Sequence, residues 1–167
     1  IGARRTQSIG GMLDGTAPFH WGGDEATFEV LLTDVMTGRM MGPMLSADHA
    51  LALQDWIDLI PAWVTPPSAD AETIDRGRAC SEWETTACSS CHAGEKLTDN
   101  KSYDVGTGEP LQVPSLRGVI WRAPFLHNGC ADTLQDRFGD CGGATHGDVS
   151  ALTSAELGDL IAYLESL

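Results

Sequence analysis

Two cysteines and a histidine stand close together near the middle of the chain, as Cys88, Cys91 and His92. The spacing C-x-x-C-H is the signature for covalent attachment of haem. Two thiols one helical turn apart can add to the two vinyl groups of a single haem, and the next histidine then becomes the proximal ligand of the iron. We therefore predict one haem c on Cys88 and Cys91, with His92 as an iron ligand.

The same cysteine spacing occurs in zinc sites and in redox-active C-x-x-C motifs. A zinc site needs two more ligands at comparable spacing, and the only other close pair of this kind is Cys141 with His146. A thioredoxin-like motif is expected beside a β-α-β pattern, which this sequence does not show. The context therefore favours haem.

Three further cysteines indicate the compartment. Cys130 and Cys141 are close in sequence and flanked by glycines, which favours a disulfide between them. Haem is attached to such motifs outside the cytoplasm, where disulfides also persist, so we expect a periplasmic or extracellular location. Cys80 is left over and is expected to be a small apolar residue buried on a helix.

The charge of the chain excludes some partners. Its 167 residues suffice for one or two small domains, and the formal net charge is −14. This acidity argues against nucleic acid as a partner. It would attract a redox partner protein with a basic surface, although it also serves simply to keep a secreted protein soluble. No transmembrane segment is expected, because no stretch approaches the ~20 apolar residues that span a membrane.

An internal repeat organises the elements around the haem motif. The first copy contains Ala17-Pro18-Phe19-His20, and the second contains Ala123-Pro124-Phe125-Leu126-His127. His20 and His127 follow Ser8 and Ser115 at equal distances, which predicts that the two histidines occupy matched positions. Each copy ends in a predicted amphipathic helix, capped by Ser46 in the first copy and by Thr153 in the second.

The repeat predicts how the chain is divided into domains. Residues 1–62 lack a C-x-x-C-H motif and are interpreted as part of a haem domain whose attachment motif, with a second haem, lies upstream. Residues 63–67 form a proline-containing linker. Residues 68–167 then make a complete mono-haem domain, with a helix from Ser68 to about Trp83, a polar loop over 93–113 and a short helix over 133–138.

Longer motifs resemble those of the bacterial di-haem cytochrome c peroxidase family and its electron-transfer relatives. They are the haem motif, Val113-Pro114-Ser115-Leu116-Arg117-Gly118-Val119, and residues 123–129. The resemblance covers nearly all of residues 70–167, and residues 17–24 are similar to a motif of the family's N-terminal haem domain. It implies a mainly α fold, in which a class-I-like cytochrome c domain is preceded by the rear half of a second one.

The resemblance also bears on individual residues. It implies that Arg117 faces a haem propionate, the alternative being an ordinary solvent-exposed arginine. His127 is expected to line the haem pocket. The family usually supplies a methionine ligand after the position of His127, but all five methionines of this chain precede the linker. We favour His146 as the second axial ligand, with His127, an open site or a methionine reaching across as alternatives.

These observations together predict an extracytoplasmic c-type cytochrome that carries one covalent haem and transfers single electrons. A first alternative is the half through which electrons enter a di-haem peroxidase-like enzyme, whose catalytic haem lies outside this chain. A second alternative is a module that only docks a larger complex. The chain has no attachment motif for a second haem, which argues against peroxidase chemistry within the chain itself.

Overall fold

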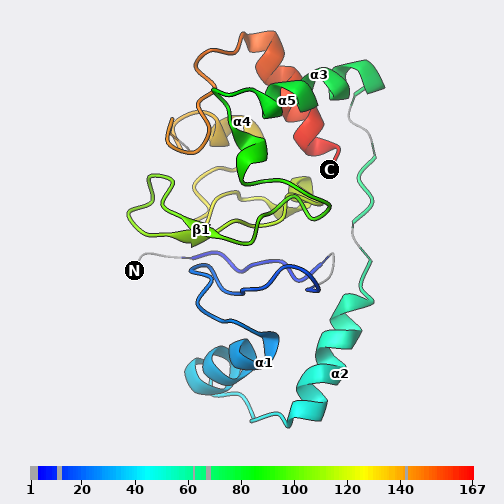
Figure 1. Cartoon of the computed structure of the whole chain (residues 1–167), viewed down its shortest axis with the longest axis vertical. Coiled ribbons are helices and arrows are strands. Elements are labelled where there is room, and N and C mark those ends of the chain that lie inside the picture. Colours follow the sequence, from blue (N-terminus) through cyan, green and yellow to red (C-terminus); the bar gives the residue numbers. More distant parts are fainter. Residues whose placement is uncertain (1–3, 11–12, 62, 67–68, 142) are drawn as a thin grey trace.

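The computed structural model describes residues 4–10, 13–61, 63–66, 69–141 and 143–167. The helices are α1 (Phe28–Leu31), α2 (Ala47–Asp58), α3 (Ala71–Glu82), α4 (Leu134–Arg137) and α5 (Ser154–Glu165). A π-helical segment, Leu32–Arg39, continues α1, and 3₁₀ turns cover Cys88–Ser90 and Val119–Arg122. The strands β1 (Ser102–Tyr103) and β2 (Leu111–Gln112) pair antiparallel. The fold is therefore mostly helical (Figure 1). No helix in the described part is long and apolar enough to cross a membrane.

The long helices begin where the sequence predicts capping. The Ser46 side chain caps α2, and Thr153 and Glu156 form a reciprocal capping box at the start of α5, so both predicted caps are confirmed. Asp70 caps α3. Ser68, at which this helix was predicted to begin, lies outside the described residues. Capping satisfies amide groups that the first turn of a helix leaves without partners.

The buried apolar side chains form two separate clusters, one in each half of the chain. The cluster in the second half consists of Cys80, Val119, Phe125, Ala131, Leu134, Leu160 and Leu164. The cluster in the first half consists of Leu13, Phe28, Leu32, Ala50 and Ile57. Cys80 is only 3% exposed and carries a free thiol, which confirms that it is a buried apolar side chain. The domain boundaries at residues 62 and 68 remain a prediction.

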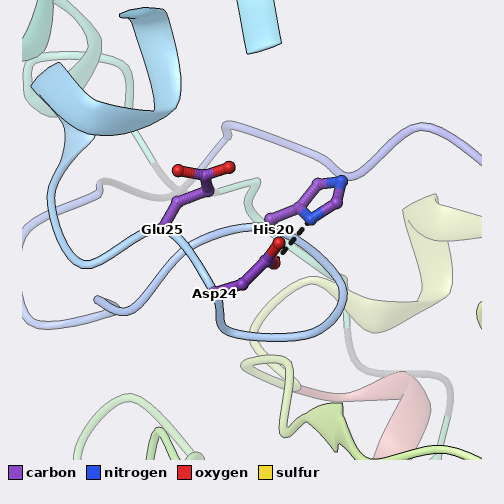
Figure 2. Close-up of side chains that lie close together, drawn as sticks. All are labelled: His20, Asp24 and Glu25. Carbon is purple, nitrogen blue, oxygen red and sulfur yellow. Dashed lines mark hydrogen bonds and ion pairs between the residues drawn. The ribbon is translucent and has the colours of Figure 1, made fainter. Parts of the chain in front are cut away.

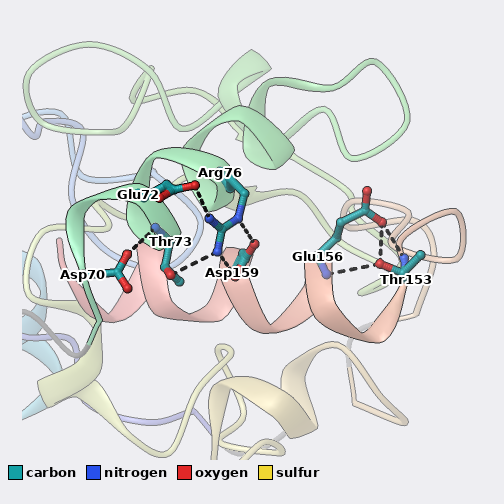
Figure 3. Close-up of polar contacts among 7 residues, drawn as sticks. All are labelled: Asp70, Glu72, Thr73, Arg76, Thr153, Glu156 and Asp159. Atoms are coloured by element: carbon teal, nitrogen blue, oxygen red, sulfur yellow. Dashed lines mark hydrogen bonds and ion pairs between the residues drawn. The ribbon is translucent and has the colours of Figure 1, made fainter.

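Helices α3 and α5 pack closely where they cross at Gly77. A Cβ atom at this position would overlap the carbonyl oxygen of Asp159 in α5, so glycine is what allows the two backbones to approach. Beside it, Arg76 Nε donates to the carboxylate of Asp159 at 2.6 Å (Figure 3). This crossing holds the end of α3, from which the chain continues to Cys88.

The two copies of the repeat have the same local backbone. An isolated antiparallel bridge joins Phe19 to Glu25 in the first copy and Phe125 to Ala131 in the second. Inside each bridge, a glycine amide donates to the residue three positions earlier: Gly23 to His20 in the first copy and Gly129 to Leu126 in the second. The internal repeat is therefore a feature of the structure as well as of the sequence.

The register of the repeat differs by one residue from the predicted one. The left-handed residue directly after each phenylalanine is His20, with φ 71°, in the first copy and Leu126, with φ 65°, in the second. His127 consequently corresponds to Trp21, and the prediction that His20 and His127 are matched is wrong. The reason is that the second copy reaches its Ala-Pro-Phe segment one residue sooner after its serine.

The corresponding residues of the two copies meet where the halves of the molecule join. The rings of Trp21 and His127 lie edge to face with their centroids 6.2 Å apart. Trp21 Nε1 donates to the carbonyl oxygen of Arg5, and the Arg5 amide donates to the carbonyl oxygen of His127. The hairpin of β1 and β2, within a region predicted to be a loop, contributes to the same seam through Ser102, whose hydroxyl donates to Gly22.

Candidate haem-binding site

The attachment motif lies in a tight turn just after α3. Cys88 begins a 3₁₀ turn, and the His92 amide donates to the Cys88 carbonyl oxygen at 2.9 Å. Both Cys88 and Cys91 are half-buried free thiols. Burial raises the pKa of the Cys88 thiol. The turn therefore presents two thiols and an imidazole within a few residues, as attachment of one haem requires.

The ring of His92 is oriented by a backbone carbonyl. His92 Nδ1 lies 3.2 Å from the carbonyl oxygen of Leu97, which favours the tautomer that donates from Nδ1 and leaves Nε2 free for a metal. Burial lowers the pKa of His92. A neutral imidazole with an oriented free nitrogen is the state that ligates iron.

His146 faces His92 from the other side of the site. The ring centroids lie 6.3 Å apart, and the ring planes are inclined by 29°. Burial in the first place, and then the charge of Arg137 and the ring of His92, lower the pKa of His146 to about 3. The structure thus brings the two imidazoles to one place, although they are far apart in sequence.

The spacing of these rings fits two axial ligands of one iron. Imidazole nitrogens bind first-row metal ions at about 2 Å, so two rings on opposite sides of one ion have centroids roughly 6 Å apart. The observed 6.3 Å agrees with this spacing. The donor set of two thiols and two imidazoles therefore fits a covalently attached, bis-histidine haem.

The turn that carries His146 packs against the attachment motif. Gly147 has φ 83°, and a Cβ atom there would lie 3.0 Å from the Thr86 carbonyl oxygen and 3.8 Å from Cys88 Sγ. On the other side, Thr145 Oγ1 donates to the carbonyl oxygen of Val105 at 2.8 Å. Gly147 is needed both for its positive φ and for this close approach.

A disulfide holds the preceding loop. Cys130 and Cys141 are joined, so the predicted bond is confirmed. It ties the segment before α4 to the segment after it, and the chain then leads to His146.

The structure adds a residue that the sequence analysis missed. Arg137, at the end of α4, is partly buried and donates from Nη2 to the carbonyl oxygen of His146. Its neighbours in sequence form no recognisable motif, so only the fold brings Arg137 to the site.

Four arginines donate to backbone carbonyls without forming an ion pair in the described part of the chain: Arg5, Arg117, Arg122 and Arg137. Arg117 is exposed and donates to Glu95 at 2.7 Å, so its contact with a propionate stays a prediction. Arg122 donates to Ser115 at 2.6 Å, but its buried Nε has no partner. An unpaired buried donor fits a carboxylate such as a haem propionate.

His127 is not part of the pair formed by His92 and His146. It packs on Trp21 at the seam, and burial lowers its pKa. Of the two histidines considered as the second axial ligand, it is His146 that the structure brings opposite His92.

A second cluster of polar side chains lies in the first half. His20, Asp24 and Glu25 place their polar atoms within 4.8 Å of one another. Figure 2 shows that the marked contact joins only His20 Nδ1 and Asp24, at 2.7 Å. The buried carboxylate of Glu25 pairs instead with Arg39 at 3.5 Å. These groups therefore already have partners within the protein.

Neither a protein-family model nor a curated protein matches the chain. Solved structures that share its fold include the following two. A chain of Kuenenia stuttgartiensis hydrazine synthase matches with a TM-score of 0.84 at 20% identity, over 98% of this chain and 72% of that chain. A MauG-like protein associated with microbial copper homeostasis matches with a TM-score of 0.73 at 17% identity, over 99% and 73% of the two chains. The likeness is one of fold and agrees with the mostly helical architecture.

Proposed function

We propose that the protein is an extracytoplasmic c-type cytochrome that attaches one haem through Cys88 and Cys91 and transfers single electrons. The observation that carries this proposal is the 6.3 Å separation of the His92 and His146 ring centroids beside the two free thiols. Haem supplies a one-electron couple between ferric and ferrous iron. The confirmed disulfide supports an oxidising compartment.

The residues of the site have distinct tasks in this proposal. Cys88 and Cys91 would hold the haem covalently, and His92 and His146 would both ligate its iron. Ligation by two protein imidazoles would leave no position for peroxide, which favours electron transfer over peroxide chemistry. Partial burial lowers the pKa of both imidazoles and so favours their neutral form, which is the form that ligates a metal. Arg122 offers an unpaired donor to a propionate.

Stopped-flow spectroscopy with a small reductant and with hydrogen peroxide tests this function. We expect the holoprotein to take up one electron per chain rapidly and to show no peroxide-dependent turnover. Sustained peroxide reduction by this chain alone would contradict a pure carrier role.

A second candidate function is favoured by the surface of the first half. Large apolar side chains are exposed along the π-helical segment and α2: Met36, Met40, Met41, Met44, Leu45, Leu51, Trp56 and Leu59. A cavity of about 250 Å³ opens among Leu32, Met36, Met40, Pro43 and Leu53. Such contiguous apolar surface usually marks a contact with another molecule or segment.

This surface supports the alternative in which the chain is the half through which electrons enter a di-haem peroxidase-like enzyme. The apolar face would then be covered by an upstream segment with the second, catalytic haem. Peroxide turnover by the natural full-length protein, together with no turnover by residues 1–167, would favour this alternative. Turnover by neither would leave the carrier function.

A further inference from the structure

Arg137 is held in place by the short helix that it ends. Thr133 and Asp136 form a reciprocal capping box at the start of α4, and the Arg137 guanidinium lies over the ring of Phe138, 4.6 Å from its centroid. The disulfide between Cys130 and Cys141 encloses the same helix. The position of the guanidinium is therefore set by contacts within α4 and the loop that the disulfide closes.

The guanidinium lies between the attachment motif and the turn of His146. Its Nη2 donates to the carbonyl oxygen of His146. A Cβ atom built on Gly147 would lie 3.9 Å from Arg137 Nη2 and 3.8 Å from Cys88 Sγ. One side chain thus contacts the histidine turn beside the very cysteine that is proposed to bind the haem.

The charge of Arg137 is not balanced by a neighbouring acid. In the described part of the chain, every ion pair involves a basic residue other than Arg137, and Arg137 is partly buried. A buried charge without a counter-ion is costly. Packing of α4 alone would be served as well by an apolar side chain, so the charge of Arg137 points to a role at the site.

We propose that Arg137 is a positioning residue that holds His146 opposite His92 and also places a fixed positive charge beside the haem. This inference rests on the proposed haem function. The hydrogen bond fixes the backbone that carries His146, so the imidazole dissociates less often from the iron. Oxidation of the iron adds a positive charge, which the guanidinium disfavours. Arg137 therefore raises the midpoint potential.

Two substitutions separate these effects in the haem-loaded protein. Arg137→Gln removes the charge and the guanidinium fork, whereas Arg137→Lys keeps the charge and loses the fork. Arg78→Gln is the matched control, because Arg78 is exposed on α3 and pairs there with Asp75. The measurements are the rate at which cyanide binds to the ferric protein, which reports dissociation of His146, and the midpoint potential.

We expect both Arg137 variants to bind cyanide at least about tenfold faster than the wild type, since a charge-assisted hydrogen bond is lost or weakened. Arg137→Gln should also lower the midpoint potential, whereas Arg137→Lys should keep it. Arg78→Gln should change neither quantity. The inference is overturned if both Arg137 variants match Arg78→Gln in both measurements.

The haem content separates this inference from the proposed function. The spectrum of denatured wild-type protein shows whether haem is covalently bound. If it is absent, the proposed function fails. If it is present and low-spin, but the Arg137 variants behave as the control, only the role of Arg137 fails. Should Arg137→Gln not fold, cyanide binding by Arg137→Lys still decides the positioning role.

Discussion

The turn at His146 is fixed by contacts on both sides of the histidine. Thr145 donates to the loop that contains Val105, and Gly147 packs on the carbonyl oxygen of Thr86. Arg137 binds the carbonyl oxygen of His146 itself. Contacts of this kind hold a metal ligand in one orientation, and their loss commonly weakens a metal site. The position of the ring opposite His92 thus follows from its surroundings.

Replacement of His146 by alanine should change the spin state of the iron without releasing the haem. With one axial imidazole lost, the ferric spectrum should turn from low-spin to high-spin, while Cys88 and Cys91 still hold the haem covalently. Absorption and electron paramagnetic resonance spectra measure this. His127→Ala is the control, because His127 packs on Trp21. A low-spin spectrum that survives in His146→Ala but is lost in His127→Ala would transfer the ligand role to His127.

Site residues differ in how far the sequence predicts them. Cys88, Cys91 and His92 form a local motif that chemistry alone explains, and the absence of methionines after the motif narrows the predicted second ligand to His127 or His146. Arg137 and Arg122 could not be predicted in this way, because an arginine acquires its role here from burial and from the carbonyls around it. Neither property has a sequence signal.

At the scale of elements, the predictable parts are those with a local pattern. Helices α2 and α5 have apolar residues at helical spacing and polar caps at Ser46 and Thr153. The hairpin of β1 and β2 has two residues in each strand, too few to show alternation, and it depends on contacts with the first half such as that of Ser102 with Gly22. Long-range contacts of this kind decide structure that propensity leaves open.

A pair of glycine substitutions tests the crossing of α3 and α5. Gly77→Ala should destabilise the protein by at least about 2 kcal/mol, because the new methyl group would overlap backbone of α5. Gly158→Ala should stabilise it by about 0.5–1 kcal/mol, since Gly158 lies in α5 with nothing near its Cβ position. Urea unfolding measures both. Equal effects of the two substitutions would contradict this packing.

At the scale of the whole molecule, two surface properties stand out. The net charge is −14, which suits long-range attraction of a basic redox partner. The first half exposes large apolar side chains such as Met41, 86% exposed, and Leu59, 79% exposed. Apolar surface of this kind suits a contact that persists, whereas charge suits an encounter that is brief and frequent.

The charge predicts opposite salt effects for small oxidants of opposite sign. Oxidation of the reduced protein by hexaammineruthenium(III) should slow as ionic strength rises, because screening weakens its attraction to the acidic surface. Oxidation by ferricyanide should become faster, because screening weakens its repulsion. Stopped-flow rates at low and high salt measure both. The same direction of change for the two reagents would exclude electrostatic steering by the net charge.

Covalent attachment of haem through Cys88 and Cys91 is the claim on which the whole account depends, and mass spectrometry under denaturing conditions tests it most directly. Protein produced in a host that matures c-type cytochromes should have the mass of the polypeptide plus one haem. After proteolysis, the adduct should lie on the peptide that contains Cys88 and Cys91. A polypeptide without the haem mass, with both of these thiols free to react with an alkylating agent, would contradict the account.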